Sequence, residues 1–202
     1  MVQYRIELPT PRLDSETSIE KALLKRRSIR EYIPGSLTLQ DVGQLLWAAQ
    51  GITHSERGFR TAPSAGALFP LEVYAVAGQV EGLAPGVYKY LPHDHALAKV
   101  TEGDVRKGLA ADALGQEWVE EAPLNIVLTA VYRRTTRKYG DRGIQYVHME
   151  IGIAAQNVYL QAVALGLGTV FVGAFIDDRV SARLQLPSEE RPLCILPVGR
   201  LP

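Results

Sequence analysis

The stretch QYVHMEIGIAAQNVYLQAVALGLGTVFV, residues 145–172, holds the longest periodic segment of the chain. Its apolar residues recur at helical spacing, at Ile151, Ala155, Val158, Ala162 and Leu165. This spacing predicts that the longest helix spans Gln145–Leu165 and buries one face. Gly166 suits the position just beyond the end of that helix, and Thr169–Val172 is typical of a short buried strand.

The same region raises the question of a membrane span, because residues 151–176 contain no charged side chain. Gln156, Asn157 and Gln161 interrupt the apolar run, and glycines divide it into a helical half and an extended half. We therefore expect a buried core helix followed by a buried strand, with no membrane partner.

The flanking segments decide between a parallel and an antiparallel sheet. Strand, helix and strand from Leu124 to Val172 would suit a crossover unit. However, Val87–Leu91 and Leu97–Val100 flank Pro92-His93-Asp94, which predicts a hairpin and so an antiparallel element. We expect an α+β fold rather than a doubly wound sheet. The other expected elements are strands at Glu72–Ala77, Leu124–Val131 and Leu193–Val198, helices after Ser18, after Thr38 and at Asp104–Leu114, Glu117–Ala122 and Asp178–Leu186, a loop at Gly58–Pro70 and a basic loop at Arg133–Gly143.

Composition excludes several classes of protein. The 202 residues include 22 Lys and Arg and 22 Asp and Glu, so the formal net charge is zero and a nucleic-acid partner is not expected. The single cysteine, Cys194, excludes an internal disulfide and favours a reducing compartment, the cytoplasm. Residues 1–12 lack the apolar core of a secretory signal. We expect an arm over residues 1–17 and a single domain over residues 18–202.

Arginines gather in Arg26-Arg27-Ser28-Ile29-Arg30. Guanidinium groups bind phosphate through planar, charged contacts, so the cluster is a candidate phosphate site. If the preceding helix continues, Arg26 and Arg30 share one of its faces. The alternative is a solvated last turn of a helix, where cations complement the helix dipole.

A run of small residues follows in Arg60-Thr61-Ala62-Pro63-Ser64-Ala65-Gly66-Ala67. Small side chains let a backbone approach a flat ligand closely, and its N–H groups can then donate to polar edges. Pro63 and Pro70 favour a rigid loop. The alternative is an ordinary surface loop.

Other motifs are weaker. Gly166-Leu167-Gly168 lacks the third glycine and the following helix of a dinucleotide fingerprint. His93 and His95 lie in the predicted turn without a carboxylate partner at helical spacing, so no metal site is expected. Lys138-Tyr139, beside Arg137 and Arg142, offers a positive, proton-donating pair or simply a basic loop.

Together these segments resemble the nitroreductase superfamily of FMN-dependent oxidoreductases, and in particular its SagB-type dehydrogenase branch, which includes azoline oxidases. The matching stretches run from Arg26 to Tyr32 and from Arg60 to Glu72, and include Ala154-Ala155-Gln156-Asn157 and the residues from Ala164 to Gly168. The resemblance covers the chain from about Ser18 to its end. It implies a nitroreductase-like α+β fold, a mainly antiparallel sheet flanked by helices around a long central helix, and an intertwined homodimer with FMN at the interface.

The resemblance also implies roles for individual residues. Arg26, Ser28 and Arg30 would hold the phosphate and ribityl end of FMN, with Arg27 adding backbone contacts or charge and Arg200 lying near the phosphate. Pro63, Ser64, Ala65 and Gly66 would reach the flavin ring from the partner subunit, and Gly173 and Ala174 would face flavin N5. Lys138 and Tyr139 match a pair that azoline oxidases use near the substrate.

Three functions follow from this resemblance. The first is ping-pong hydride transfer from NAD(P)H through FMN to a small organic acceptor, such as a nitro or quinone compound. The second is a SagB-type dehydrogenase or azoline oxidase in which Lys138 or Tyr139 accepts a proton. The third is a flavin-binding protein with little turnover.

Overall fold

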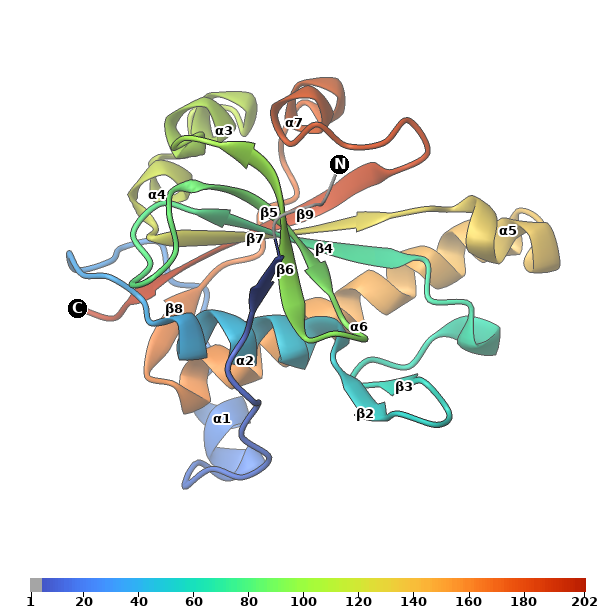
Figure 1. Cartoon of the computed structure of the whole chain (residues 1–202), viewed down its shortest axis with the longest axis horizontal. Coiled ribbons are helices and arrows are strands. Elements are labelled where there is room, and N and C mark those ends of the chain that lie inside the picture. The colour runs from blue at the N-terminus through green and yellow to red at the C-terminus, as the bar shows by residue number, and fades with distance from the viewer. Residues whose placement is uncertain (1–4) are drawn as a thin grey trace.

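The computed structural model describes residues 5–202, so the first four residues of the expected N-terminal arm lie outside the described residues. One sheet of seven strands forms its centre, in the order β1-β6-β5-β4-β7-β9-β8 (Figure 1). Every neighbouring pair in this sheet is antiparallel, which confirms the α+β prediction. The strands are β1 (Arg5–Glu7), β4 (Leu71–Ala77), β5 (Gly86–Leu91), β6 (Ala96–Glu102), β7 (Leu124–Ala130), β8 (Leu167–Thr169) and β9 (Arg191–Arg200).

Helices cover both faces of the sheet. In Figure 1 the long helix α6 and helix α2 lie on one face, while α3 and α7 lie on the other. The helices are α1 (Ile19–Lys25), α2 (Leu39–Gln50), α3 (Arg106–Asp112), α4 (Glu117–Glu121), α5 (Arg133–Tyr139), α6 (Arg142–Ala164) and α7 (Asp177–Arg183). A small hairpin of β2 (Ile52–His54) and β3 (Phe59–Arg60) precedes the short 3₁₀ helix η1 (Ala65–Ala67).

Strand residues alternate between two hydrophobic cores. Val73 and Ala75 of β4 pack in the core beneath α2 and α6, whereas Tyr74 and Val76 pack in the core beneath α3, α4 and α7. The period of two is that of a strand whose faces are both covered. Cys194 is fully buried in the α6-side core, and burial raises the pKa of its thiol well above the usual range.

Local signals placed several helix ends correctly. The Thr38 side chain accepts from the Asp41 N–H and the Asp41 carboxylate accepts from the Thr38 N–H, which is a complete capping box. The Ser18 hydroxyl accepts from the Lys21 N–H at the start of α1. Gly166 follows α6 with a φ of 70°, a left-handed conformation that glycine adopts without strain.

Three predicted segments differ in the structure. The loop expected at Gly58–Pro70 contains β3 and η1. The basic loop expected over Arg133–Gly143 is wrong, because Arg133–Tyr139 forms α5 and α6 begins at Arg142. Arginine and lysine are good helix formers, so their charge does not argue for a loop. The strand expected at Thr169–Val172 is β8, Leu167–Thr169, two residues earlier. Beyond it the Phe171 N–H donates to the Tyr159 hydroxyl, and Val172 alone pairs again with β9, at Ile195.

Over the described residues, no helix combines the length and the apolar character that crossing a membrane would need.

Candidate active site

Helix α6 links two groups of predicted site residues. Its first half contacts the loop that contains Ser64, and its second half contacts the segment after α1. Glu150 and Tyr159 mark these two contacts, and they are nine positions apart along the helix, about 14 Å. We call residues 61–69 the turn and residues 26–30 the arginine segment.

The turn has an unusual backbone conformation. Gly66, Ala67 and Phe69 have φ values of 64°, 54° and 45°. For Ala67 and Phe69 this left-handed conformation is strained, and it persists only where surrounding contacts impose it. The Ser64 hydroxyl accepts from the Phe69 N–H at 2.9 Å, and the Ser64 carbonyl accepts from the Ala67 N–H at 3.0 Å. These bonds close the turn on itself.

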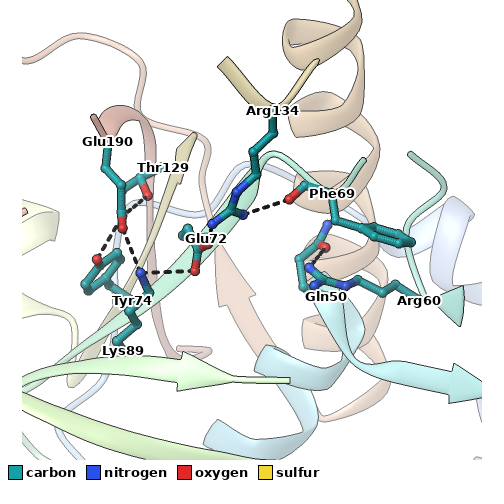
Figure 2. Close-up of polar contacts among 9 residues, drawn as sticks. All are labelled: Gln50, Arg60, Phe69, Glu72, Tyr74, Lys89, Thr129, Arg134 and Glu190. Atoms are coloured by element: carbon teal, nitrogen blue, oxygen red, sulfur yellow. Dashed lines mark hydrogen bonds and ion pairs between the residues drawn. The ribbon is translucent and has the colours of Figure 1, made fainter. Parts of the chain in front are cut away.

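Three helices hold the turn in place. The Thr61 hydroxyl donates to the Trp47 carbonyl of α2 at 2.9 Å, and the Asn157 amide of α6 donates to the Thr61 carbonyl at 3.2 Å. From α5, Arg134 donates to the Phe69 carbonyl at 2.9 Å (Figure 2). The polar contacts of the turn therefore come from elements that are far apart in the sequence.

Lys138 and Tyr139 lie directly over Gly66. A Cβ atom added to Gly66 would lie 2.7 Å from the Tyr139 hydroxyl and 3.0 Å from the Lys138 ammonium. A side chain at position 66 would therefore displace the ends of both residues. The fold brings the predicted proton-transfer pair and the predicted flavin-contacting turn together within one chain.

A chain of ionic contacts fixes α5 relative to the sheet (Figure 2). The Glu72 carboxylate pairs with both Arg134 and Lys89, and Lys89 also pairs with Glu190 at 2.7 Å. Glu190 is buried and accepts hydrogen bonds from two further hydroxyls, those of Tyr74 and Thr129. Through Arg134, this network ends on the turn.

Sequence reasoning missed Glu150, which lies beneath the turn. Its side chain is 3% exposed, and its Oε1 atom has no hydrogen-bond partner among the described residues. Burial raises the pKa of Glu150 to about 7, although hydrogen bonds from Ser64 and the Ala65 backbone and the charge of Arg60 act in the opposite direction. The signal was present, because Glu150 falls on the buried stripe of α6 beside Val147 and Ala154.

The arginine segment is extended rather than helical. Helix α1 ends at Lys25 and Arg26 has φ −53° and ψ 123°, so Arg26 and Arg30 do not share a helix face. The prolongation of α1 considered above is therefore wrong. Instead the Ile29 N–H donates to the Thr169 carbonyl at 2.9 Å, which docks the segment on the end of β8.

The guanidiniums of this segment carry uncompensated charge. Arg26 lies over the Tyr159 ring at 5.2 Å and Arg30 over the Trp118 ring at 5.6 Å. Arg27 donates to the carbonyls of Leu24 and Arg26. Within residues 5–202, no carboxylate forms an ion pair with any of the three arginines.

The other predicted cofactor residues lie at the same end of α6. The hydroxyls of Ser28 and Tyr159 are 3.2 Å apart, and the Tyr159 hydroxyl accepts from the Phe171 N–H at 2.7 Å. Phe171 leads to Gly173 and Ala174, which are both exposed. The Arg200 guanidinium is instead directed to the Ser36 carbonyl, at 2.8 and 3.0 Å.

His95, weighed above as half of a metal pair, has a structural role. Its ring nitrogens lie 2.9 Å from the Tyr90 hydroxyl and 3.0 Å from the Pro9 carbonyl. Asp94, which follows His93, pairs with Arg5. These contacts connect the hairpin to the first described residues.

Known proteins with similar sequences and structures show the family of this chain. A sequence model described as the nitroreductase family matches residues 23–200. The chain belongs to the nitroreductase family. A Methanocaldococcus jannaschii protein named as a nitroreductase is 48% identical over 195 residues, which are 96% of each chain. A solved structure from Ralstonia eutropha, also named as a nitroreductase, superimposes with a TM-score of 0.85 at 30% identity, covering 98% of this chain and 90% of that one.

A SagB-type relative is also similar. The microcin B17-processing protein McbC of Escherichia coli is 29% identical over 132 residues, 63% of this chain and 48% of that protein. This nitroreductase-family chain is therefore an oxidoreductase with relatives in the SagB-type branch, and it matches about half of that relative's length.

Proposed function

We propose that this oxidoreductase is FMN-dependent and carries electron pairs from NAD(P)H to a small organic acceptor, such as a nitro or quinone compound, in a ping-pong cycle. The observation that carries the proposal is the charge of Arg26, Arg27 and Arg30 near one end of α6, which no carboxylate in residues 5–202 neutralises. Near the other end of α6 lies the turn, whose small residues Pro63 and Gly66 are exposed. The free, buried thiol of Cys194 suits a reducing compartment, and we propose the cytoplasm.

The arginine segment fits the phosphate of FMN. A phosphate dianion needs several charged donors, and guanidiniums that lie on aromatic rings keep their N–H groups available. We assign Arg26, Arg27 and Arg30 to the phosphate, with the Ser28 hydroxyl beside them. The Arg200 guanidinium would add positive charge near the phosphate, because its bonds to the Ser36 carbonyl use only its Nε and one terminal nitrogen.

Small residues suit the flat ring of the cofactor. Pro63 and Gly66 are exposed, and Ser64 and Ala65 are half-buried, so residues 63–66 present backbone rather than large side chains. Gly173 and Ala174 are also exposed, and a Cβ at Gly173 would meet only the Phe171 ring, at 3.4 Å. We assign the turn and the Gly173–Ala174 backbone to the two sides of the ring.

We propose a homodimer in which the turn of one chain serves the cofactor held by the other. Exposed apolar side chains on α1 and α6 support it, because such surfaces mark interaction sites. They are Ile19, Leu23, Leu24, Ile144, Met149 and Ile153. We expect an obligate interface that buries more than about 2,000 Å². Sedimentation should show a dimer at micromolar concentration, and a monomer that still binds FMN tightly would contradict the shared site.

The chain's own residues would bind, orient and exchange protons. FMN, when bound, would supply the acceptor and donor of the electron pair. The arginine segment would hold it, the turn would set the plane of its ring, and the nicotinamide and the acceptor would occupy the same face in succession. Lys138 and Tyr139 over Gly66 would stand at the substrate side of the turn.

A second function is favoured by the position of that pair. A SagB-type dehydrogenase or azoline oxidase removes a proton as well as a hydride from its substrate, and a base must then lie within hydrogen-bond reach. Lys138 and Tyr139 lie against the backbone that we assign to the flavin ring, which suits this role. McbC, the 29% identical relative, is named as a microcin-processing protein.

Two measurements test these proposals. The absorption spectrum of the purified protein should show flavin bands at near one FMN per chain, and a colourless protein that takes up no FMN would contradict the cofactor assignment. Anaerobic stopped-flow mixing with NADH and NADPH should bleach the flavin rapidly with at least one donor. Slow bleaching with both would favour the low-turnover flavin-binding protein.

Lys138→Ala and Tyr139→Phe separate the reductase from the dehydrogenase. Reduction by a nicotinamide needs no proton acceptor, so both variants should keep that half-reaction. A loss of about 100-fold or more that is confined to substrate oxidation would support the dehydrogenase. Small, equal losses in both half-reactions would support the reductase.

A further inference from the structure

The backbone that follows β8 offers two consecutive donors that the chain itself leaves unused. The N–H groups of Gly173 and Ala174 have no hydrogen-bond partner among residues 5–202, and both residues are exposed. The sheet fixes the first of these donors. The Ile195 N–H of β9 donates to the Val172 carbonyl at 2.9 Å, and that carbonyl lies in the same peptide plane as the Gly173 N–H.

The second donor depends on a side chain. The Gln116 Nε2 atom donates to the Ala174 carbonyl at 2.9 Å and to the Ala113 carbonyl at 2.8 Å, so both of its N–H groups are used. The peptide unit that carries the Ala174 N–H therefore lies between two held planes, one at Val172 and one at Ala174. Glycine has wide freedom in φ and ψ, so this unit would be free to turn about Gly173 if the bond from Gln116 were lost.

The link between α3 and α4 places Gln116 against this segment. Leu114 and Gly115 have φ values of 61° and 76°, and for Leu114 this left-handed conformation is strained. Such a conformation persists only where surrounding contacts impose it. From α3, the Asp112 carbonyl accepts from the Ile176 N–H at 2.9 Å. The α3–α4 link and the end of α3 thus hold two points of residues 173–176.

Helix α4 also reaches the arginine segment. The Arg30 guanidinium lies over the ring of Trp118, which is two residues beyond Gln116, at 5.6 Å from the ring centre. Arg30 and Ala174 are far apart in the sequence, yet each contacts a side chain at the start of α4. The two segments that the proposed function assigns to one cofactor therefore meet at this helix.

We propose that Gln116 is a positioning residue of the flavin site: by holding the Ala174 carbonyl, it directs the Ala174 N–H toward the cofactor ring. This deepens the proposed function and rests on it, because that function assigns the Gly173–Ala174 backbone to the ring. Gln116 acts only through this backbone. An N–H that donates to flavin N5 favours the oxidised ring, whose N5 has a free lone pair, over the reduced ring, whose N5 carries a hydrogen. Loss of the Gln116 bond should therefore raise the reduction potential.

The first test needs no cofactor. ¹⁵N relaxation of the full-length chain without added flavin gives the order parameter of the Ala174 N–H bond. It should be about 0.85 in the wild type and below about 0.6 in Gln116→Met, which keeps the length of the side chain and removes both donors. Gln40→Met is the matched control, because the half-buried Gln40 also donates from Nε2 to a backbone carbonyl, that of Thr10 at 3.3 Å. It should leave the Ala174 order parameter unchanged.

A second variant guards against loss of folding in Gln116→Met. Gln116→Glu keeps the shape of the side chain, but a carboxylate accepts hydrogen bonds and does not donate them. It should therefore loosen the Ala174 N–H as the methionine does. An Ala174 order parameter in either variant that equals the wild-type value would overturn the assignment of Gln116. So would a wild-type value that is already below about 0.6.

The reduction potential of bound FMN separates this inference from the proposed function. In Gln116→Met the ratio of the affinities for reduced and oxidised FMN should rise about tenfold, which raises the potential of a two-electron couple by about 30 mV. Gln40→Met should match the wild type. If the wild type binds no FMN, the proposed function fails, while relaxation still decides whether Gln116 holds the Ala174 peptide. If FMN binds with the same potential in all three proteins, the proposed function stands and the positioning role is overturned.

Discussion

Helix α6 contacts the turn near one end and the arginine segment near the other. Hydrogen bonds with α2, α5 and α6 hold the turn, whereas the arginine segment docks on the end of β8 through Ile29, and its Arg26 and Arg30 lie over aromatic rings. The turn has left-handed residues at Ala67 and Phe69, and its carbonyls and hydroxyls are bonded within the chain. The arginine segment has an extended backbone and guanidiniums that no carboxylate in residues 5–202 neutralises.

The difference between the two segments matches the two parts of the proposed cofactor, a flat ring and a phosphate. A flat ring requires a precise backbone shape, and shape can be built only by contacts from several elements. A phosphate requires charge, and a guanidinium that is already paired with a carboxylate would have less to offer. The polar groups of the turn are therefore bonded within the chain, whereas the guanidiniums of Arg26 and Arg30 lie over aromatic rings and have no carboxylate partner among residues 5–202.

The largest effect that we expect is on the stability of the folded chain, from substitution of Glu150 beneath the turn. Because the native pKa is about 7 and the ordinary value is 4.5, the folded chain holds a proton that the unfolded chain releases between these pH values. The stabilising contribution of the neutral carboxyl is thus complete below about pH 4.5 and is lost as pH rises through 7. Glu150→Gln cannot ionise, so above pH 7 it should be more stable than the wild type by up to about 3 kcal/mol.

Thermal unfolding between pH 5 and pH 8 measures this difference. The gain of Glu150→Gln over the wild type should grow with pH, and Glu56→Gln, at an exposed position on the β2–β3 hairpin, should show no such growth. A gain that is constant across the range would mean that Glu150 does not titrate near pH 7.

The arginine side is tested by Arg26→Ala. Loss of a charge-assisted contact to phosphate should weaken FMN binding by about 1.5–3 kcal/mol, a factor of roughly 10 to 150. Arg12→Ala removes an equal charge from an exposed position outside the segment and should leave binding nearly unchanged. Flavin affinity is measured by fluorescence titration. Equal affinity in the two variants would contradict the assignment of Arg26 to the phosphate of FMN.

Gly66→Ala and Gly58→Ala form a matched pair that sharpens the role of the turn. Their φ values are 64° and 62°, so each substitution should cost about 1 kcal/mol of stability for the left-handed backbone. A Cβ at Gly58 meets nothing within 4 Å, whereas one at Gly66 meets the ends of Tyr139 and Lys138. We expect similar unfolding midpoints but reduced turnover in Gly66→Ala alone. Equal turnover would show that the contact between the turn and α5 has no functional role.

The smallest effect concerns Tyr159, which joins Ser28 to Phe171. Tyr159→Phe removes the acceptor of the Phe171 N–H and the partner of the Ser28 hydroxyl, while the ring beneath Arg26 remains. Stability should fall by about 1 kcal/mol, the net value of such a hydrogen bond, with only a small change in FMN affinity. A loss of affinity as large as that of Arg26→Ala would mean that the hydroxyl, and not the ring, is what α6 contributes at this end.

Much of the architecture could be predicted because it depends on local order. The apolar stripe of α6, the capping box at Thr38 and the hairpin around Pro92 are signals contained within a few consecutive residues. Helix α5 was missed because its exposed side carries arginine and lysine, and its helical state depends on packing against α6. The resemblance also predicts the arginine segment and the turn as site segments, since both are continuous stretches of sequence.

The sequence by itself determined which residue types are available and in what order: arginines after α1, small residues after β3, and a Lys-Tyr pair before α6. Only the tertiary structure decided that Lys138 and Tyr139 lie over Gly66, and that Glu150 lies beneath the same turn. The reason is that these contacts join segments that are distant in the chain. Their geometry depends on how α5 is anchored through Arg134 and Glu72, and that anchoring is not encoded in a local pattern.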